Sequence, residues 1–155
     1  MPADSYFTED SYFVDTNVIL YSLDVRSHAK RLAALAWLDH LWRKGSGRLS
    51  WQVLNEFYAN AVRKMKVPTP EARDAVLIFT RWQPCTMSVA VVEQAWHWMD
   101  RAQLSYWDAL VLASARRLGC RWLLSEDFQA GRDFDGITVV NPFTDRPPHE
   151  APHPA

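Results

Sequence analysis

Four acidic residues stand at positions from which they could act together: Asp15, Glu56, Asp108 and Asp127. The first and the last each follow a short β-prone run, at 11–14 and 121–124. The middle two lie in the first turns of predicted helices. Because ligands of open α/β sheets bind beyond the carboxyl ends of the strands, we expect the four carboxylates to meet at that edge.

Carboxylates that gather at one edge repel one another unless a cation neutralises them. No pair of His or Cys residues accompanies these acids, so the donors are oxygens. Oxygen donors favour Mg²⁺ or Mn²⁺ over Zn²⁺. Such ions activate water and stabilise the charge that develops on a phosphodiester.

Each acid also has an explanation that requires no chemistry. Asp15 could close its strand in an Asx-turn, and Asp127 could form a turn or cap a helix. Glu56 could be a solvated helix residue, and Asp108 could complete a capping box with Ser105. These explanations do not account for the shared placement of all four residues.

The elements that must position the acids follow from periodicity and helix stop signals. Helices are predicted over 28–44, from about 51 to Pro68, from Thr69 to before Pro84, over 88–102, and from 105 to Gly119. A third strand is predicted over 137–140. Strands separated by helix-length connections favour a mainly parallel sheet with helices on both faces. We expect one domain over 1–145 and a disordered Pro-rich tail over 146–155.

Composition agrees with one globular domain of 155 residues, 48% of them hydrophobic. No apolar run is long enough to span a membrane, and the acidic N-terminus does not resemble a secretory signal, so we expect a cytoplasmic protein. The formal net charge of −1 does not indicate nucleic acid. It does not exclude it either, because 13 of the 17 cations are Arg, which binds phosphate bidentately.

Four segments resemble, in order, the acidic motifs of the PIN-domain nucleases, and in particular those of the VapC-type toxins of bacterial toxin–antitoxin pairs. They are Tyr-Phe-Val-Asp-Thr-Asn-Val-Ile-Leu at 12–20, Asn-Glu-Phe at 55–57, Tyr-Trp-Asp-Ala-Leu at 106–110 and Leu-Ser-Glu-Asp-Phe at 124–128. The resemblance extends over about residues 11–143. It implies a three-layer α/β/α sandwich with a mainly parallel sheet.

The resemblance also implies site residues and partners. The catalytic and metal-binding acids would be Asp15, Glu56, Asp108 and Asp127. The supporting residues would be Thr16, Asn17 and Ser125. Members of this type are Mg²⁺-dependent endoribonucleases that form homodimers and are silenced by a small antitoxin protein. The implied reaction is hydrolysis of RNA by a water that Mg²⁺ (or Mn²⁺) activates.

Two further expectations concern what the chain binds. Arg132, five residues after Asp127, is the expected contact to substrate phosphate. Trp96 and Trp98 lie about 200° apart on a helical wheel, so one of them should face a partner. The alternative function is a catalytically silent module of the same fold that binds a protein or RNA without cutting it.

Overall fold

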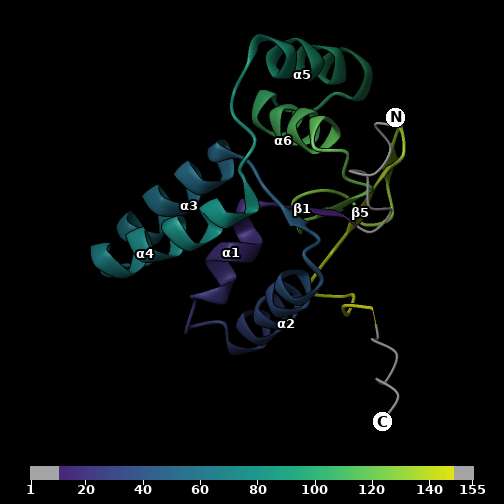
Figure 1. Cartoon of the computed structure of the whole chain (residues 1–155). Helices are drawn as coiled ribbons and strands as arrows, with labels where there is room; N and C mark the ends of the chain where they lie inside the picture. Colours follow the sequence, from purple (N-terminus) through teal and green to yellow (C-terminus); the bar gives the residue numbers. More distant parts are fainter. Residues whose placement is uncertain (1–10, 149–155) are drawn as a thin grey trace, which may run out of the picture.

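A five-stranded sheet organises the chain in the computed structural model, which describes residues 11–148 (Figure 1). Its strands are β1 (Tyr12–Val14), β2 (Gly47–Arg48), β3 (Trp122–Leu124), β4 (Asp133–Phe134) and β5 (Ile137–Val140). They lie in the order β2-β1-β3-β5-β4. All neighbours are parallel except β4, which pairs antiparallel with β5. The prediction of a mainly parallel sheet is therefore confirmed.

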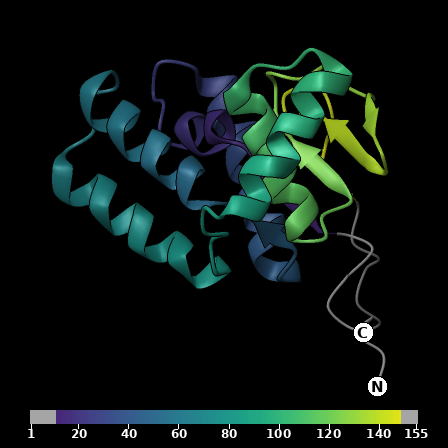
Figure 2. The ribbon, with the colours of Figure 1, turned by 90° about the horizontal axis from the view of Figure 1, so that it is seen from above.

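Helices connect the strands and cover the sheet. They are α1 (Thr16–Ser22), α2 (His28–Lys44), α3 (Trp51–Arg63), α4 (Thr69–Phe79), α5 (Val89–Ala102) and α6 (Tyr106–Arg117). Figure 1 shows α5 and α6 on one side of the sheet and α1 and α2 on the other. Seen from above, α3 and α4 run side by side away from the sheet (Figure 2). The arrangement is the expected three-layer sandwich.

Serine caps fix where three of the helices begin. Ser50, Ser88 and Ser105 each accept a hydrogen bond from the backbone N–H three residues later. Helix α4 begins at Thr69, as predicted, but Pro68 precedes it in the N-cap position and provides no side-chain hydrogen bond. The same helix was expected to run unbroken to Pro84. It ends at Phe79 and continues as the 3₁₀ turn η2 (Thr80–Trp82).

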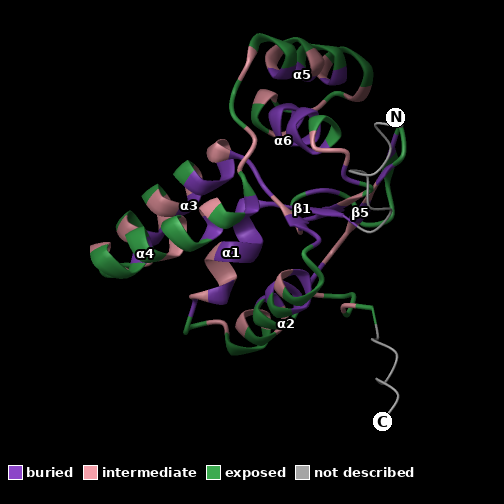
Figure 3. Cartoon of the chain, in the orientation of Figure 1, coloured by how far each residue is buried: buried purple, intermediate pink, exposed green. Residues whose placement is uncertain are grey.

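The core fills both faces of the sheet (Figure 3). Phe13 and Val14 of β1 and Leu123 and Leu124 of β3 are completely buried. Strands buried on both faces read as continuous apolar runs, which is what parallel sheets require. β1 and β3 are therefore rigid supports for the residues that follow them.

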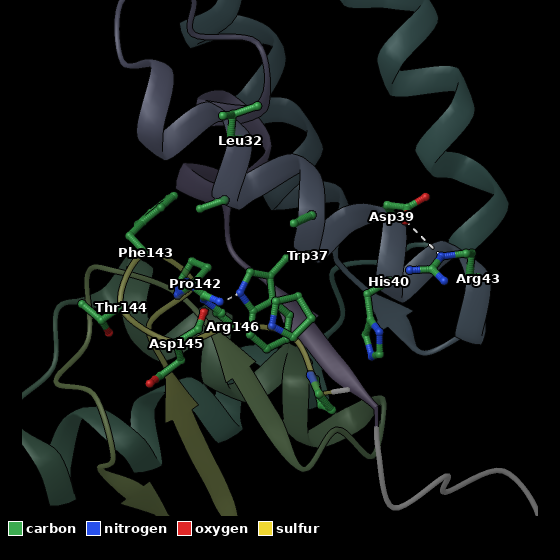
Figure 4. Close-up of a pocket in the computed structure, with 14 residues that line it drawn as sticks. Leu32, Trp37, Asp39, His40, Arg43, Pro142, Phe143, Thr144, Asp145 and Arg146 are labelled. Atoms are coloured by element: carbon green, nitrogen blue, oxygen red, sulfur yellow. Dashed lines mark hydrogen bonds and ion pairs between the residues drawn. The ribbon is translucent and has the colours of Figure 1, made fainter. Parts of the chain in front are cut away.

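The C-terminal segment returns across α2, where Trp37 Nε1 donates a hydrogen bond of 2.9 Å to the carbonyl of Asp145. A cavity of about 850 Å³ lies between α2 and this segment (Figure 4), and none of the four predicted acids lines it. Residues 146–148 form neither helix nor strand. The rest of the predicted tail, 149–155, lies outside the described residues. Within residues 11–148, no helix is both long enough and apolar enough to cross a membrane.

Candidate active site

Asp15 is the centre of the candidate site. It follows β1 as the N-cap of α1, and its Oδ1 accepts a hydrogen bond of 2.8 Å from the backbone N–H of Thr16. Its Oδ2 accepts one of 2.7 Å from the hydroxyl of Ser125, which follows β3. Only 5% of Asp15 is exposed. Because β1 and β3 are parallel neighbours, both residues lie at the carboxyl edge of the sheet.

Asn17 joins Asp15 to Asp127. Its side-chain Nδ2 donates to Oδ2 of Asp127 at 3.1 Å and reaches Oδ2 of Asp15 at 3.5 Å. The hydroxyl of Ser125 accepts from the backbone N–H of Asp127 at 3.1 Å. Asp127 itself is exposed, so this small network runs from a buried acid to the protein surface. These contacts join Asn17 and Ser125 to both acids, and the supporting roles predicted for the two residues stay a prediction.

Glu56 reaches the same place from α3. Its Oε2 accepts a hydrogen bond of 3.0 Å from the hydroxyl of Thr16, and its Oε1 accepts one of 3.1 Å from Nε2 of Gln52. Gln52 Nε2 also lies 3.3 Å from the backbone carbonyl of Trp107. Glu56 is therefore held toward the site, rather than being freely solvated, and Gln52 ties α3 to the first turn of α6.

Asp108 lies in that first turn, and its backbone N–H donates to the hydroxyl of Ser105 at 3.1 Å. The predicted helix cap is therefore present. Burial raises the pKa of Asp108, a hydrogen bond with Ser105 lowers it, and the charges of Asp127 and Glu56 raise it. Asp108 therefore lies in a capped first turn and is also near two of the other acids.

The electrostatics of the site converge on Asp15. Burial raises the pKa of Asp15 to about 7, against the hydrogen bonds from Ser125 and Thr16 that lower it. The negative charges of Asp127 and Glu56 raise it further. Asp127 and Glu56 are therefore near enough to Asp15 and to Asp108 for their charges to raise the pKa of both.

The sequence model of the PIN domain family matches residues 12–132, a span that contains all four acids. The chain belongs to the PIN domain family. No curated protein sequence matches it. A similar solved structure is VapC20 of Mycobacterium tuberculosis, described as a sarcin–ricin loop cleaving toxin. It is 22% identical with a TM-score of 0.52, and the match covers 73% of this chain and 87% of that one. This likeness confirms the fold.

The donor set of this PIN domain fits a hard divalent cation. The groups that converge are carboxylates, with hydroxyl and amide groups behind them, and their mutual repulsion is the state that a cation relieves. Among residues 11–148, however, no three His, Cys, Asp or Glu side chains are placed to hold an ion together. The described part of this PIN domain thus gathers negative charge suited to a cation, but its carboxylates are not arranged as ligands of one ion.

The cations around the site of the PIN domain differ in their partners. Lys30 forms an ion pair of 2.8 Å with Glu126, next to Asp127. Arg132 is exposed, and its guanidinium lies 4.4 Å from the centre of the Phe134 ring. Packing on Phe134 leaves the donors of Arg132 available, so its predicted contact with phosphate stays a prediction.

Gln52 is the site residue that sequence reasoning missed. It lies one turn before Glu56 on α3, and that i, i+4 spacing was the only local signal. Its other partner, the carbonyl of Trp107, is 55 residues away in the chain. The pairing of α3 with the start of α6 in this PIN domain is visible only in the folded structure.

Proposed function

We propose that the chain is a metal-dependent endoribonuclease of the VapC type that acts as the toxin of a toxin–antitoxin pair. The observation that carries the proposal is Asp15, a buried acid with a pKa raised to about 7 beside two further negative charges. A fold gains nothing in stability from such an arrangement, and perturbed acids of this kind are typical of functional sites.

The residues that would hold Mg²⁺ or Mn²⁺ are Asp15, Glu56, Asp108 and Asp127. When bound, the ion supplies charge stabilisation for the phosphodiester and lowers the pKa of water. Because no ready-made ligand group of this kind is present among residues 11–148, the carboxylates would adjust on binding. Asp15 is the most buried of the four, and Asp127 is the most exposed.

The protein itself supplies orientation. Ser125 and Asn17 hold the carboxylate of Asp15, and Asn17 also holds that of Asp127. Thr16 and Gln52 hold one oxygen each of Glu56. Substrate would approach from the side of Asp127, because burial increases from there toward Asp15. Groups fixed in this way lower the cost of reorganisation during the reaction.

The toxin role is supported by the similar structure, which is described as a sarcin–ricin loop cleaving toxin. A small antitoxin and a second copy of the chain would then be protein partners. Trp98 is buried, whereas 56% of Trp96 is exposed, so α5 offers apolar area for such a contact.

The direct test of activity is cleavage of a structured RNA by the pure protein. We expect cleavage with Mg²⁺ or Mn²⁺, none with EDTA, and none by Asp15→Asn. Asp39→Asn is the matched control, because Asp39 is an exposed acid paired with Arg43 outside the site. A folded wild-type protein that binds RNA in Mg²⁺ without cutting it would favour the silent module instead.

The test of the biological role is growth. Expression of the wild-type chain should arrest growth, expression of Asp15→Asn should not, and co-expression with the adjacent small open reading frame should restore growth and give a stable complex. Unimpaired growth at a high level of wild-type protein would contradict the toxin role. It would not contradict the nuclease activity, which the RNA-cleavage assay tests separately.

A further inference from the structure

A second cavity lies at the opposite edge of the sheet from the acids. Its volume is about 610 Å³, within the range of small-ligand sites. It lies beside Gly45, which precedes β2, and Leu118, which follows α6. Gly47 of β2 pairs with Tyr12, the first residue of β1, so this is the amino edge of the sheet. The cavity is therefore separate from the candidate active site.

The lining of this cavity is basic. It includes Arg48, Arg81 and Arg117, and none of the described residues that line it is acidic. The ion pairs within residues 11–148 engage Arg26, Lys30, Arg43 and Arg101, and none of the three cavity arginines. Within the described residues, these three guanidinium groups therefore have no carboxylate partner, and an anion in the cavity would supply one.

Arg48 is fixed in place by the backbone. Its Nη1 donates hydrogen bonds of 3.0 Å to the carbonyl of Gly45 and 2.8 Å to that of Gly47. The side chain is half-buried, so its charge is held at the wall of the cavity rather than moving freely in solvent. Such preorganisation reduces the entropy that is lost on binding a ligand.

The other side chains that line the cavity include two aromatic rings and one amide. The rings of Trp42 and Trp82 lie 4.8 Å apart, and Trp82 packs so closely on β2 that a Cβ at Gly47 would lie 2.4 Å from it. Gln83 lines the cavity with a φ of 53°, in the left-handed region. A non-glycine residue there carries local strain, which is more frequent at functional positions.

We propose that this cavity is a phosphate-binding site. Arg81 and Arg117 contact the phosphate, and Arg48, held by the backbone, contributes a fixed positive charge at the edge of the cavity. Guanidinium groups bind phosphate bidentately, and the tryptophan rings give an apolar wall beside it. Arg117 lies nine residues after Asp108 on α6, about 14 Å along the helix axis. A phosphate in the cavity is therefore not the one being cleaved.

Two sources could supply this phosphate: the backbone of an RNA substrate beyond the cleaved bond, or a free ligand such as a nucleotide. The first source rests on the proposed function, and the second does not. Inorganic pyrophosphate tests the site itself, and a structured RNA then distinguishes the sources.

The decisive comparison is between two double variants of equal charge. Arg81→Gln with Arg117→Gln removes the cavity cations, and Arg63→Gln with Arg146→Gln removes two exposed cations outside the cavity. Without metal, pyrophosphate should bind the wild type saturably and change tryptophan fluorescence, because Trp42 and Trp82 line the cavity. The cavity variant should bind it at least tenfold more weakly, and the control variant should match the wild type. The absence of saturable binding, or equal losses in both variants, would overturn the proposal.

RNA binding is measured in an Asp15→Asn background to prevent cleavage. If RNA supplies the phosphate, the cavity variant should bind a hairpin RNA more weakly than the control variant. The slope of its log affinity against log salt should fall by about 0.7–0.9, the contribution of one phosphate. If a free ligand supplies it, the two variants should bind RNA equally while only the cavity variant loses pyrophosphate. With an intact Asp15, the cavity variant should still cleave a short RNA, so loss of the site is distinguishable from failure of the nuclease proposal.

Discussion

The hydroxyl of Ser125 donates a hydrogen bond of 2.7 Å to Oδ2 of Asp15, across the ends of two neighbouring parallel strands. The contact stabilises the ionised form of a carboxylate that burial would otherwise keep protonated. Asp15 therefore exchanges its proton near neutral pH, and that behaviour is measurable.

We expect the metal-free protein to lose stability as pH rises from about 4 to about 7. The carboxyl of Asp15 releases its proton near 3.8 when unfolded and near 7 when folded, so in this interval the folded state binds more protons. The loss attributable to Asp15 has an upper bound of about 4 kcal/mol. Urea unfolding in EDTA at several pH values measures it, and Asp15→Asn should show a flatter dependence. Parallel curves for the two proteins would contradict the raised pKa.

Asp108→Asn should raise the melting temperature of the metal-free protein at pH 8 by a few degrees, because it removes a charge that burial and the neighbouring acids disfavour. Added Mg²⁺ should stabilise this variant less than the wild type, as expected when a ligand of the ion is lost. Ser105→Ala, which removes the cap alone, should cost about 1 kcal/mol in both conditions. A lower melting temperature for metal-free Asp108→Asn would show that its capping role dominates.

Gln52→Ala should lower the rate of RNA cleavage by about ten- to a hundredfold with little change in melting temperature, because it frees Glu56 from its tie to α6. Gln52→Glu should be worse, since it places a like charge beside Glu56. Gln94→Ala on α5 is the matched control. A cleavage rate equal to that of the control would remove Gln52 from the site.

Arg132→Ala should weaken RNA binding and flatten its salt dependence by about 0.7–0.9, the contribution of one phosphate contact, while leaving metal affinity unchanged. Arg132→Lys should retain most of the binding. Unaltered RNA affinity at low salt would exclude the contact. A parallel loss of metal affinity would mean that Arg132 supports the acids instead.

The positions of Asp15 and Asp127 were predictable because continuous apolar runs mark buried parallel strands, and the residue after such a strand lies at the binding edge. Their convergence with Glu56 and Asp108 was predicted from motif order. The structure shows that the charges of Asp127 and Glu56 raise the pKa of both Asp15 and Asp108. The role of Gln52 was not predictable, because it depends on a partner in a distant helix.

Helix α1 was missed for a local reason. Thr16, Val18 and Ile19 are β-branched and have low helix propensity, and nearly every residue of this short helix is buried, so no amphipathic period marks it. Asp15 was therefore interpreted as the end of a strand only. It is also the N-cap that starts α1 and thereby points Thr16 and Asn17 at the acids. Strand β4 was missed because two residues carry no periodicity.

The contact between Asp15 and Ser125 spans 110 residues of sequence. This separation determines how late in translation the site can form. The chain emerges from the ribosome with its N-terminus first, so β1 and α1 exist long before β3 is made. Until 122–127 have been translated and have taken their place beside β1, Asp15 lacks both Ser125 and Asp127. A nascent or prematurely terminated chain therefore holds an incomplete site until translation of the domain is nearly finished.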